Sequence, residues 1–379
     1  MLKYTPLHDR HREAGAQLVE FGGWEMPLRY AGIVEEHFAV RRAAGLFDIS
    51  HMGELVVKGP GAEAFLNRSL TNHVAKLAEG QGQYTLLCQA DGGTIDDLYV
   101  YRLQNAEYLL VVNASRVEAD AAWFVQRLRA EPETAGVWFE NSSEVFGALA
   151  LQGAAAPAIA GTVLAGGSMA GARVPDVTGL AKNRIGQFLC CGTPVYVART
   201  GYTGEDGFEL IAPANVITAL WDRLLEAGKP FGLQPAGLGA RDTLRTEMGY
   251  PLYGHELDET ITPIEAGLVR FVALDKGDFA GRARLAEQVA SGVSKRCVAF
   301  RLADKGPPPR PGYALFVPGE PEQIGRVTSG TYSPSLGLGI GLGYVPPPQS
   351  LPGTPLQMEV RGRRVDAIVE KKPLYRKTS

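Results

Sequence analysis

Apolar and polar positions in the first part of the chain switch between helical and extended spacing. Apolar residues recur at helical spacing in Ile33–Ala44, which predicts a helix that Gly45 ends. Gly53–Gly59 has the residues of a strand that ends in a turn, and Pro60 opens a second predicted helix that runs to Leu70. This order indicates a mixed α and β fold.

A predicted hairpin and a further strand and helix follow. Tyr84–Cys88 and Leu98–Leu103 are rich in β-forming residues and flank turn residues at 91–93, so they predict two antiparallel strands. Tyr108–Val112 predicts a third strand. The pattern from Ser115 to Glu118 matches a capping box at the start of the next helix.

The signals weaken between about 142 and 201, where one helix is predicted near 155–164. Amphipathic patterns at 215–227 and 241–248 predict two more helices. From Lys295 onward, short β segments are separated by proline clusters, which favours an all-β C-terminal part.

The change of pattern divides the chain into two regions. We predict an α+β protein in which residues 1–275 form mixed α/β N-terminal domains and residues 290–379 form an all-β, barrel-like C-terminal domain.

Charge and composition exclude several classes of protein. The 379 residues contain 38 Lys and Arg against 41 Asp and Glu, a net charge of −3, so we expect no nucleic-acid partner. The chain has no run of about 18 apolar residues, and its N-terminus is too charged for a secretory signal, so we expect a cytoplasmic protein with no membrane partner. The four cysteines include no CxxC pair and are predicted to be reduced, structural thiols.

Familiar nucleotide and metal motifs are absent from the sequence. The glycines at 337–343 lead into a β segment and not a helix, which favours a β-turn or bulge over a phosphate loop. His8 and His11 are three residues apart, but they lack further His or Cys ligands nearby, so we predict surface histidines and no metal site. His51 lies in a polar turn, where it could line a cleft or knit the turn together.

Two segments are unusually dense in polar and glycine residues. In 91–98 (DGGTIDDL), Asp96 and Asp97 enter a strand whose alternation sends one side chain to each face. In 199–210 (RTGYTGEDGFEL), Glu209 points away from its apolar neighbours and needs a hydrogen-bonding partner in apolar surroundings. A ligand is one such partner. For any single acid, capping a turn on the surface is the alternative.

A series of motifs covers nearly the whole chain. They are TPLHDRH from Thr5, FGGWEMPL from Phe21, FDISHMGE from Phe47, GGTIDDL from Gly92, VVNAS from Val111, RTGYTGEDGFEL from Arg199, PAGLGARDTLRTEMGYPLYGHEL from Pro235, TSGTYSPSLG from Thr328 and KKPLYR from Lys371. Together and in this order, the motifs resemble those of the aminomethyltransferase, or T-protein, family of the glycine cleavage system.

The resemblance implies both a fold and an activity. The implied fold is a three-domain cloverleaf around a central folate cavity, with two intertwined α+β subdomains in residues 1–275. The implied activity belongs to glycine catabolism: the methylene carbon of an aminomethyl group on the lipoyl arm of the H-protein passes to the co-substrate tetrahydrofolate. The products are 5,10-methylenetetrahydrofolate, ammonia and dihydrolipoyl H-protein. The P- and L-proteins belong to the same system.

The family's catalytic carboxylate matches Asp97. The resemblance implies that Asp97 holds the folate amine nitrogens and stabilises positive charge on the transferred carbon, or relays a proton. Asp96 is then expected to be the outward neighbour. Glu209 and Asn113 match positions that contact the pterin, and we expect the Asn113 amide to be free as a donor or an acceptor.

Three further positions are implied to line the same cavity. Tyr84 and Tyr202 would offer aromatic surface and a hydroxyl at the rim, although core packing is an alternative for Tyr84. Met52 would form an apolar wall.

Two arginines match folate-binding positions. Arg241 is implied to hold the carboxylate tail or a carbonyl of the folate, and an ion pair with Asp242 or Glu247 is the alternative. Arg376, near the C-terminus, matches a further binding position.

The chain departs from the family pattern at 180–184, where aromatic residues often stand. Lys182 and Arg184 are hypothesised to contact an acidic partner such as the H-protein. Relatives with the same fold include folate-linked demethylation domains and an iron–sulfur-cluster assembly factor. The Lys-Gly-Cys motif of the assembly factor is absent here. A demethylase and a non-catalytic folate-binding protein remain alternatives, the second disfavoured by the intact Asp97.

Overall fold

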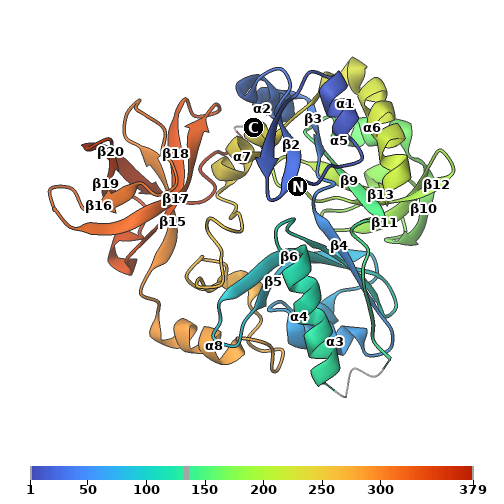
Figure 1. The fold of residues 1–379 in the computed structure, drawn as a ribbon, viewed down its shortest axis with the longest axis horizontal. Coiled ribbons are helices and arrows are strands. Elements are labelled where there is room, and N and C mark those ends of the chain that lie inside the picture. The colour runs from blue at the N-terminus through green and yellow to red at the C-terminus, as the bar shows by residue number, and fades with distance from the viewer. Residues whose placement is uncertain (1, 132–135, 378–379) are drawn as a thin grey trace.

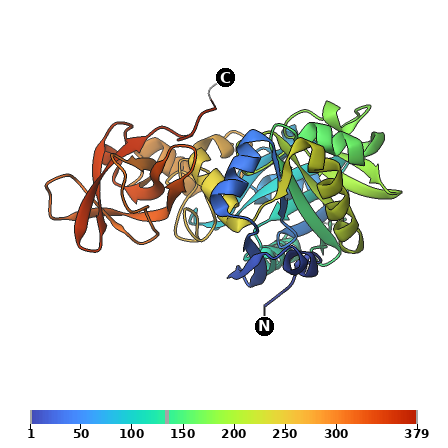
Figure 2. The same ribbon diagram turned by 90° about the horizontal axis from the view of Figure 1, so that it is seen from above.

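The structure, a computed structural model, describes residues 2–131 and 136–377. It has three lobes (Figure 1): one sheet with its helices at the bottom, a second sheet with its helices at the upper right, and a barrel at the left. Figure 2 shows the barrel at one end of the molecule and the two chain ends on opposite sides. Within the described residues, no helix is long and apolar enough to cross a membrane.

The first lobe is an antiparallel sheet of strand order β5-β6-β7-β4-β8 that carries two helices on one face. Leu55, Leu98 and Leu110 from the strands pack against Phe65 and Phe124 from the helices, so burial of this apolar layer holds the lobe together. Its elements are β4 (Gly53–Lys58), α3 (Ala62–Ser69), β5 (Gln81–Cys88), β6 (Thr94–Gln104), β7 (Glu107–Val112), α4 (Val117–Ala130) and β8 (Trp138–Asn141).

The second lobe is a sheet of strand order β10-β11-β12-β13-β9-β3-β14, in which only the β14–β3 pair is parallel. Ile159, Ile217 and Leu220 of two helices pack against one face. The elements are β3 (Ala44–Asp48), β9 (Phe146–Gln152), α5 (Ala156–Val163), β10 (Ala165–Gly171), β11 (Ile185–Cys190), β12 (Thr193–Ala198), β13 (Gly207–Pro213), α6 (Ala214–Gly228) and β14 (Leu233–Pro235).

The remaining faces of the two sheets pack against each other. Tyr101 and Leu109 of the first sheet share a buried cluster with Phe47 and Ile211 of the second, and Leu244 of α7 (Leu238–Met248) completes it. The helix α2 (Ile33–Arg42) also contacts α7. Met52 also packs against this layer.

The third lobe is a closed barrel of strand order β15-β18-β17-β16-β19-β20. The α+β class and the C-terminal barrel are therefore confirmed. The strands are β15 (Arg296–Leu302), β16 (Ala314–Phe316), β17 (Gln323–Ser333), β18 (Leu338–Val345), β19 (Pro355–Val360) and β20 (Arg363–Glu370). Besides α2 and α7, the helices and strands outside the three lobes include α1 (His8–Glu13), the hairpin β1 (Gln17–Phe21) and β2 (Trp24–Arg29), and α8 (Arg282–Ser291).

Several local predictions need correction. The helix α2 ends at Arg42, and Gly45 lies in strand β3, where a Cβ atom would sit 2.4 Å from Val40 Cγ2. Gly45 therefore permits close packing and does not end the helix. The predicted capping box does not form, because the N-cap of α4 is Arg116 and no side chain caps it.

Two other predictions fail wholly or in part for tertiary reasons. The predicted turn is confirmed at Gly337, which precedes β18 and has a φ of 72°. Gly339, Gly341 and Gly343 lie inside β18 instead, and a Cβ on Gly341 would meet the Phe300 ring at 2.6 Å, so these three glycines serve packing of the barrel. His11 is fully buried and not on the surface, since its ring nitrogens bond Asp48 Oδ2 (2.9 Å) and the Tyr30 hydroxyl (2.9 Å).

The buried Glu247 of α7 ties distant parts of the chain together. Its carboxylate pairs with Arg41 Nη2 of α2 (2.7 Å) and accepts a hydrogen bond from Ser335 Oγ after β17 (3.0 Å). Its backbone carbonyl accepts the N–H groups of Leu374 (2.8 Å) and Tyr375 (3.1 Å). The N-terminal region, the barrel and the C-terminal tail are thus all bonded to one residue.

We expect Glu247→Gln to lower the free energy of unfolding by about 3 kcal/mol, because Arg41 would stay buried and charged after it loses one carboxylate partner. Urea unfolding at pH 7 measures this. Glu226→Gln is the matched control, since Glu226 forms an exposed pair with Lys229 that contributes little. Equal small effects of the two substitutions would show that the buried pair is not important for stability.

Candidate active site

Asp97 lies on β6, on the face that packs toward the second sheet. It is half-buried, and neighbouring strands of the same sheet supply its partners. The Tyr84 hydroxyl of β5 donates to Asp97 Oδ2 (2.8 Å), and Asn113 Nδ2, just after β7, donates to Asp97 Oδ1 (3.0 Å). The carboxylate is therefore held by two donors before any ligand binds.

The expectation that Asp96 faces outward is wrong. Strand alternation does send Asp96 to the opposite face from Asp97, but that face is covered by α4, and Asp96 is fully buried. It accepts hydrogen bonds from the Asn113 backbone N–H at Oδ2 (3.0 Å) and from Asn113 Nδ2 at Oδ1 (2.8 Å).

Burial raises the pKa of Asp97 to about 6. The hydrogen bonds from Tyr84 and Asn113 lower it, and the nearby negative charge of Glu256 raises it. Asp97 is consequently ionised at neutral pH, yet it takes up a proton more readily than a carboxylate in water.

The Asn113 side chain has no spare donor. Its Nδ2 group donates to Asp96 Oδ1 and to both the backbone carbonyl (2.9 Å) and the carboxylate of Asp97. The prediction of an amide free to serve as a donor is therefore wrong. Its Oδ1 remains as an acceptor, since it makes no hydrogen bond to the described residues.

Glu209 on β13 finds its predicted partner within the protein. The Thr200 hydroxyl donates to Glu209 Oε2 (2.5 Å), and Thr200 also bonds the Tyr101 hydroxyl of β6 (3.0 Å). These hydrogen bonds link the two sheets. Glu209 is half-buried, and its cross-strand neighbours on the same face are the small residues Ala150 and Ala198.

The ion-pair alternative for Arg241 is wrong. Asp242 pairs instead with Arg245 (2.6 Å), and Glu247 pairs with Arg41. Within residues 2–131 and 136–377, the Arg241 guanidinium has no carboxylate at ion-pair distance. Burial lowers the pKa of Arg241, and the negative charge of nearby Glu209 opposes that shift.

Tyr202 packs against Arg241 and Tyr250. Its ring faces the Arg241 guanidinium at 4.8 Å on centroid and stacks with Tyr250 at 5.7 Å, while its hydroxyl donates to the Pro251 carbonyl. Burial raises the pKa of Tyr202 above its usual value. Asp97 raises it further and Arg241 lowers it, so both charges are close to this ring.

Met52 and Arg376 are placed at the margins of this group. Met52 is partly buried against the layer between the two sheets. Arg376 is exposed and follows Tyr375, whose ring lies 4.5 Å from the Arg41 guanidinium. The tail is therefore anchored next to Arg376, although Arg376 itself makes no hydrogen bond or ion pair with the described residues.

The sequence analysis left two roles open for His51, lining a cleft or knitting its turn together. The ring is only 2 % exposed, packs edge-on against Phe21, and leaves Nδ1 without a partner among the described residues. Burial lowers its pKa to about 4, helped by the positive charge of Arg241, so His51 is neutral.

Tyr99 was not among the residues that the sequence analysis singled out. Its alternation with Asp97 along β6 was the signal that places it on the same face.

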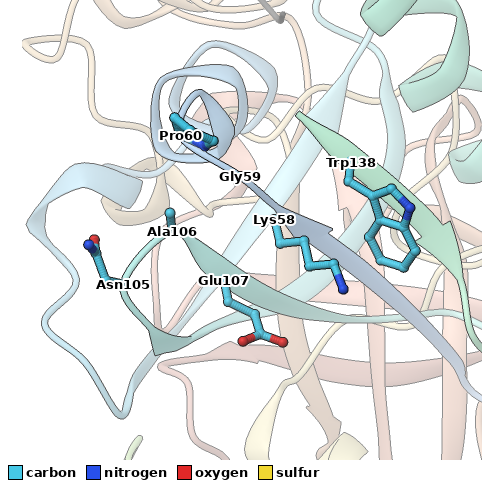
Figure 3. A pocket seen from close by; sticks show the side chains of 7 residues that line it. All are labelled: Lys58, Gly59, Pro60, Asn105, Ala106, Glu107 and Trp138. Atoms are coloured by element: carbon cyan, nitrogen blue, oxygen red, sulfur yellow. The ribbon is translucent and has the colours of Figure 1, made fainter. Parts of the chain in front are cut away.

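A separate surface pocket of about 700 Å³ lies away from these residues. Figure 3 shows its lining, in which Lys58 Nζ lies 4.0 Å from the Trp138 ring. None of the predicted site residues belongs to it. The lining residues are Lys58, Gly59, Pro60, Asn105, Ala106, Glu107 and Trp138.

Comparisons with known proteins agree over the whole chain. Residues 7–276 match the family described as the GCVT N-terminal domain, and residues 295–376 match the glycine cleavage T-protein C-terminal barrel domain. An aminomethyltransferase of Desulfitobacterium hafniense is 44 % identical over 99 % of both chains, and one of Anoxybacillus flavithermus is 45 % identical over 100 % of both.

A solved structure also matches. The crystal structure of the glycine cleavage system aminomethyltransferase T from Bartonella henselae superposes with a TM-score of 0.88 at 34 % identity, covering 99 % of this chain and 98 % of that one. The chain belongs to the glycine cleavage T-protein family and is an aminomethyltransferase.

Proposed function

We propose that this aminomethyltransferase uses tetrahydrofolate as co-substrate and the lipoyl-bearing H-protein as donor. The methylene carbon loses its bonds to the lipoyl sulfur and to the amine nitrogen, and it forms bonds to N5 and N10 of the folate. The two protons that leave N5 and N10 complete the ammonia and the dihydrolipoyl thiol. The products are 5,10-methylenetetrahydrofolate, ammonia and dihydrolipoyl H-protein.

The observation that carries this proposal is the placement of a fixed carboxylate and an unpaired guanidinium beside one aromatic ring. The Arg241 guanidinium lies 4.8 Å from the Tyr202 ring centroid, and the Asp97 carboxylate is fixed by Tyr84 (2.8 Å) and Asn113 (3.0 Å). The charges of both groups also affect the pKa of Tyr202. Tetrahydrofolate has amines at its reacting end and carboxylates on its tail, so this pair of groups suits the two ends of the ligand.

Asp97 would act on the reacting carbon and nitrogens. A preorganised carboxylate stabilises positive charge as it develops on the transferred carbon, because Tyr84 and Asn113 already fix its direction. Its raised pKa also suits it to accept a proton from a folate nitrogen at neutral pH.

Glu209 and Asn113 would orient the pterin. The second oxygen of Glu209 can accept N–H groups such as N3–H and the 2-amino group, while Thr200 holds the first. Asn113 can offer only its carbonyl oxygen, since its N–H groups are used by Asp96 and Asp97.

The three lobes in Figure 1 would form the cloverleaf around the folate cavity. Tyr84, Tyr202 and Met52 would line it with apolar and aromatic surface. Arg376 would hold an anionic part of the folate from the anchored C-terminal tail.

The protein partners follow from membership of the glycine cleavage system. We propose the H-protein as the direct partner and the P- and L-proteins as members of the same system, acting in the cytoplasm. Lys182 is exposed and Arg184 half-buried at 180–184, which leaves positive charge for an acidic surface of the H-protein.

We expect Asp97→Asn to fold with an unchanged thermal midpoint and to lose kcat by about 100-fold, because the amide cannot balance the developing positive charge. Methylenetetrahydrofolate formation from aminomethyl-loaded H-protein measures this. In the wild-type enzyme kcat/KM should fall as the pH drops below about 6, since protonation removes the Asp97 charge. Asp304→Asn, at an exposed position, is the control. Near-normal turnover of the Asp97 variant would show that the Asp97 charge does not take part in the reaction.

We expect Arg241→Gln to raise the KM for tetrahydrofolate by about 10-fold or more with a smaller effect on kcat, because a charged hydrogen bond to the folate tail is lost. Titration of folate binding by fluorescence checks this independently of turnover. The control is Arg223→Gln on the exposed face of α6. If the affinity of the Arg241 variant equals that of the control, the guanidinium does not hold the folate.

Charge reversal at Lys182 and Arg184 should raise the KM for the H-protein by about 10-fold at low salt and leave folate affinity unchanged, because like charges repel at an interface. Steady-state kinetics with varied H-protein measures the effect. Lys305→Glu on the exposed surface of the barrel is the control. Unchanged affinity for the H-protein would reject this docking surface.

A further inference from the structure

The carboxyl group of Glu54 on β4 is buried without a polar partner. Its side chain is fully buried, and neither Oε1 nor Oε2 has a hydrogen-bond partner among the described residues. Burial of a polar group without a hydrogen bond costs free energy of folding, so the position of this group is not explained by stability. None of the roles proposed above uses it.

Strand alternation places Glu54 on the face of the first sheet that packs toward the second sheet. A Cβ atom on the preceding Gly53 would lie 2.5 Å from Val117 Cγ2 of α4, so that position faces the helices. Glu54 therefore points away from the helices, to the same side as Val56, which packs in the layer between the two sheets. Asp97 lies on this same face.

The strand register gives the separation between Glu54 and the candidate site. Glu54 is directly opposite Val111 of β7, and Val111 is directly opposite Tyr99 of β6. Tyr99 is two residues after Asp97. Strand spacing and residue rise then put the backbones of Glu54 and Asp97 roughly 12 Å apart on one face, a span that two side chains and a bicyclic ring between them can fill.

The backbone of Glu54 is held by the segment after β8 as well as by β7. Its N–H group donates to Ser143 Oγ (3.0 Å), and its carbonyl accepts a hydrogen bond from the Ser142 N–H group (2.9 Å). The side chain is therefore carried by a fixed stretch of strand, as a residue that orients a ligand should be.

Apolar surroundings keep the Glu54 carboxyl group protonated. Val56 and Val111 flank it on the same face, and no Lys, Arg or His forms an ion pair with it in residues 2–131 and 136–377. Burial raises the pKa of Glu54 well above its usual range. A protonated carboxyl group has an O–H donor as well as an acceptor, whereas an ionised one has acceptors only.

The residues proposed to meet the pterin have no donor to spare. Asp97 and Glu209 are acceptors, and the N–H groups of Asn113 are already used. The Tyr84 hydroxyl donates to Asp97, and the Tyr202 hydroxyl donates to a backbone carbonyl. A pterin has two ring acceptors, N1 and the 4-oxo group, in addition to its N–H donors. A donor on the same face would complete the match.

We propose that Glu54 is a further folate-binding residue, whose protonated carboxyl group donates a hydrogen bond to N1 or the 4-oxo group of the pterin. The inference rests on the proposed function, since it takes the pterin as the ligand. Glu54 takes no part in breaking or forming covalent bonds. Its role is specificity, because it recognises an acceptor on a ring whose donors meet the other residues.

Two substitutions of Glu54 separate hydrogen bonding from packing. Glu54→Gln keeps a donor and an acceptor, and Glu54→Met keeps a similar volume without either. We expect Glu54→Gln to bind tetrahydrofolate within about threefold of the wild-type affinity, and Glu54→Met to bind it about tenfold more weakly or worse. The thermal midpoint of ligand-free Glu54→Met should equal or exceed that of the wild type, because an unpaired buried polar group is removed. Fluorescence titration and thermal unfolding measure the two quantities.

Two variants on the same face are the comparisons. Tyr99→Phe removes the hydroxyl of the nearest rival donor, which makes no hydrogen bond to the described residues. Val56→Ala disturbs the packing of the layer without removing a polar atom. We expect both variants to bind tetrahydrofolate within about threefold of the wild-type affinity.

Infrared difference spectra between folate-bound and free protein detect the donor directly. The carbonyl band of one protonated carboxyl group should shift when tetrahydrofolate binds the full wild-type chain. The shift should be missing in Glu54→Gln. This measurement needs neither turnover nor a folded Glu54→Met protein.

The outcomes are distinct. The proposal is wrong if Glu54→Met binds tetrahydrofolate as tightly as the wild type, if Tyr99→Phe alone weakens binding, or if the wild-type band does not shift. Normal folate binding by Glu54→Met, beside a wild-type enzyme that forms methylenetetrahydrofolate, would refute this inference and leave the proposed function standing. A wild-type protein that does not bind tetrahydrofolate would refute the proposed function itself.

Discussion

Neighbouring side chains on a β-strand must point to opposite faces, and this constraint on β6 determines how the candidate site is built. Because Asp96 and Asp97 are consecutive, one carboxyl group enters the layer beneath α4 while the other faces the second sheet. Asn113 can reach both because it follows β7, the strand next to β6. The sheet thus places two adjacent acids in different surroundings: Asp96 is fully buried beneath α4, and Asp97 is half-buried on the opposite face.

The helix α7 has two roles. It bonds to distant parts of the chain through Glu247 and Arg245, and it also carries the Arg241 guanidinium. Glu247 and Arg245 point to buried partners: Glu247 bonds Arg41 and Ser335, and Arg245 bonds Ser329 of the barrel (2.9 Å). Arg241 lies one turn earlier on the helix and is left without a carboxylate among the described residues. The structural ion pairs are satisfied elsewhere, so Arg241 remains available to a ligand.

The parts of the fold that depend on local sequence were predictable. The hairpin of β5 and β6, the helix α6 and the β-rich C-terminal part follow from patterns that act over a few residues. The errors arose where tertiary contacts decide. Gly45 is paired in strand β3, and Val40 leaves no room there for a side chain. His11 is buried and bonds Asp48, which is distant in sequence.

The same distinction applies to the candidate site. The motifs pointed to Asp97, Glu209 and Arg241, but only the fold shows which of their polar atoms are already used. Thr200 occupies one oxygen of Glu209, and Asp96 and Asp97 take the Asn113 amide hydrogens. A ligand in this site therefore meets carboxylate and carbonyl acceptors together with one guanidinium donor. That arrangement suits the folate proposed above, which has N–H donors at one end and carboxylates at the other.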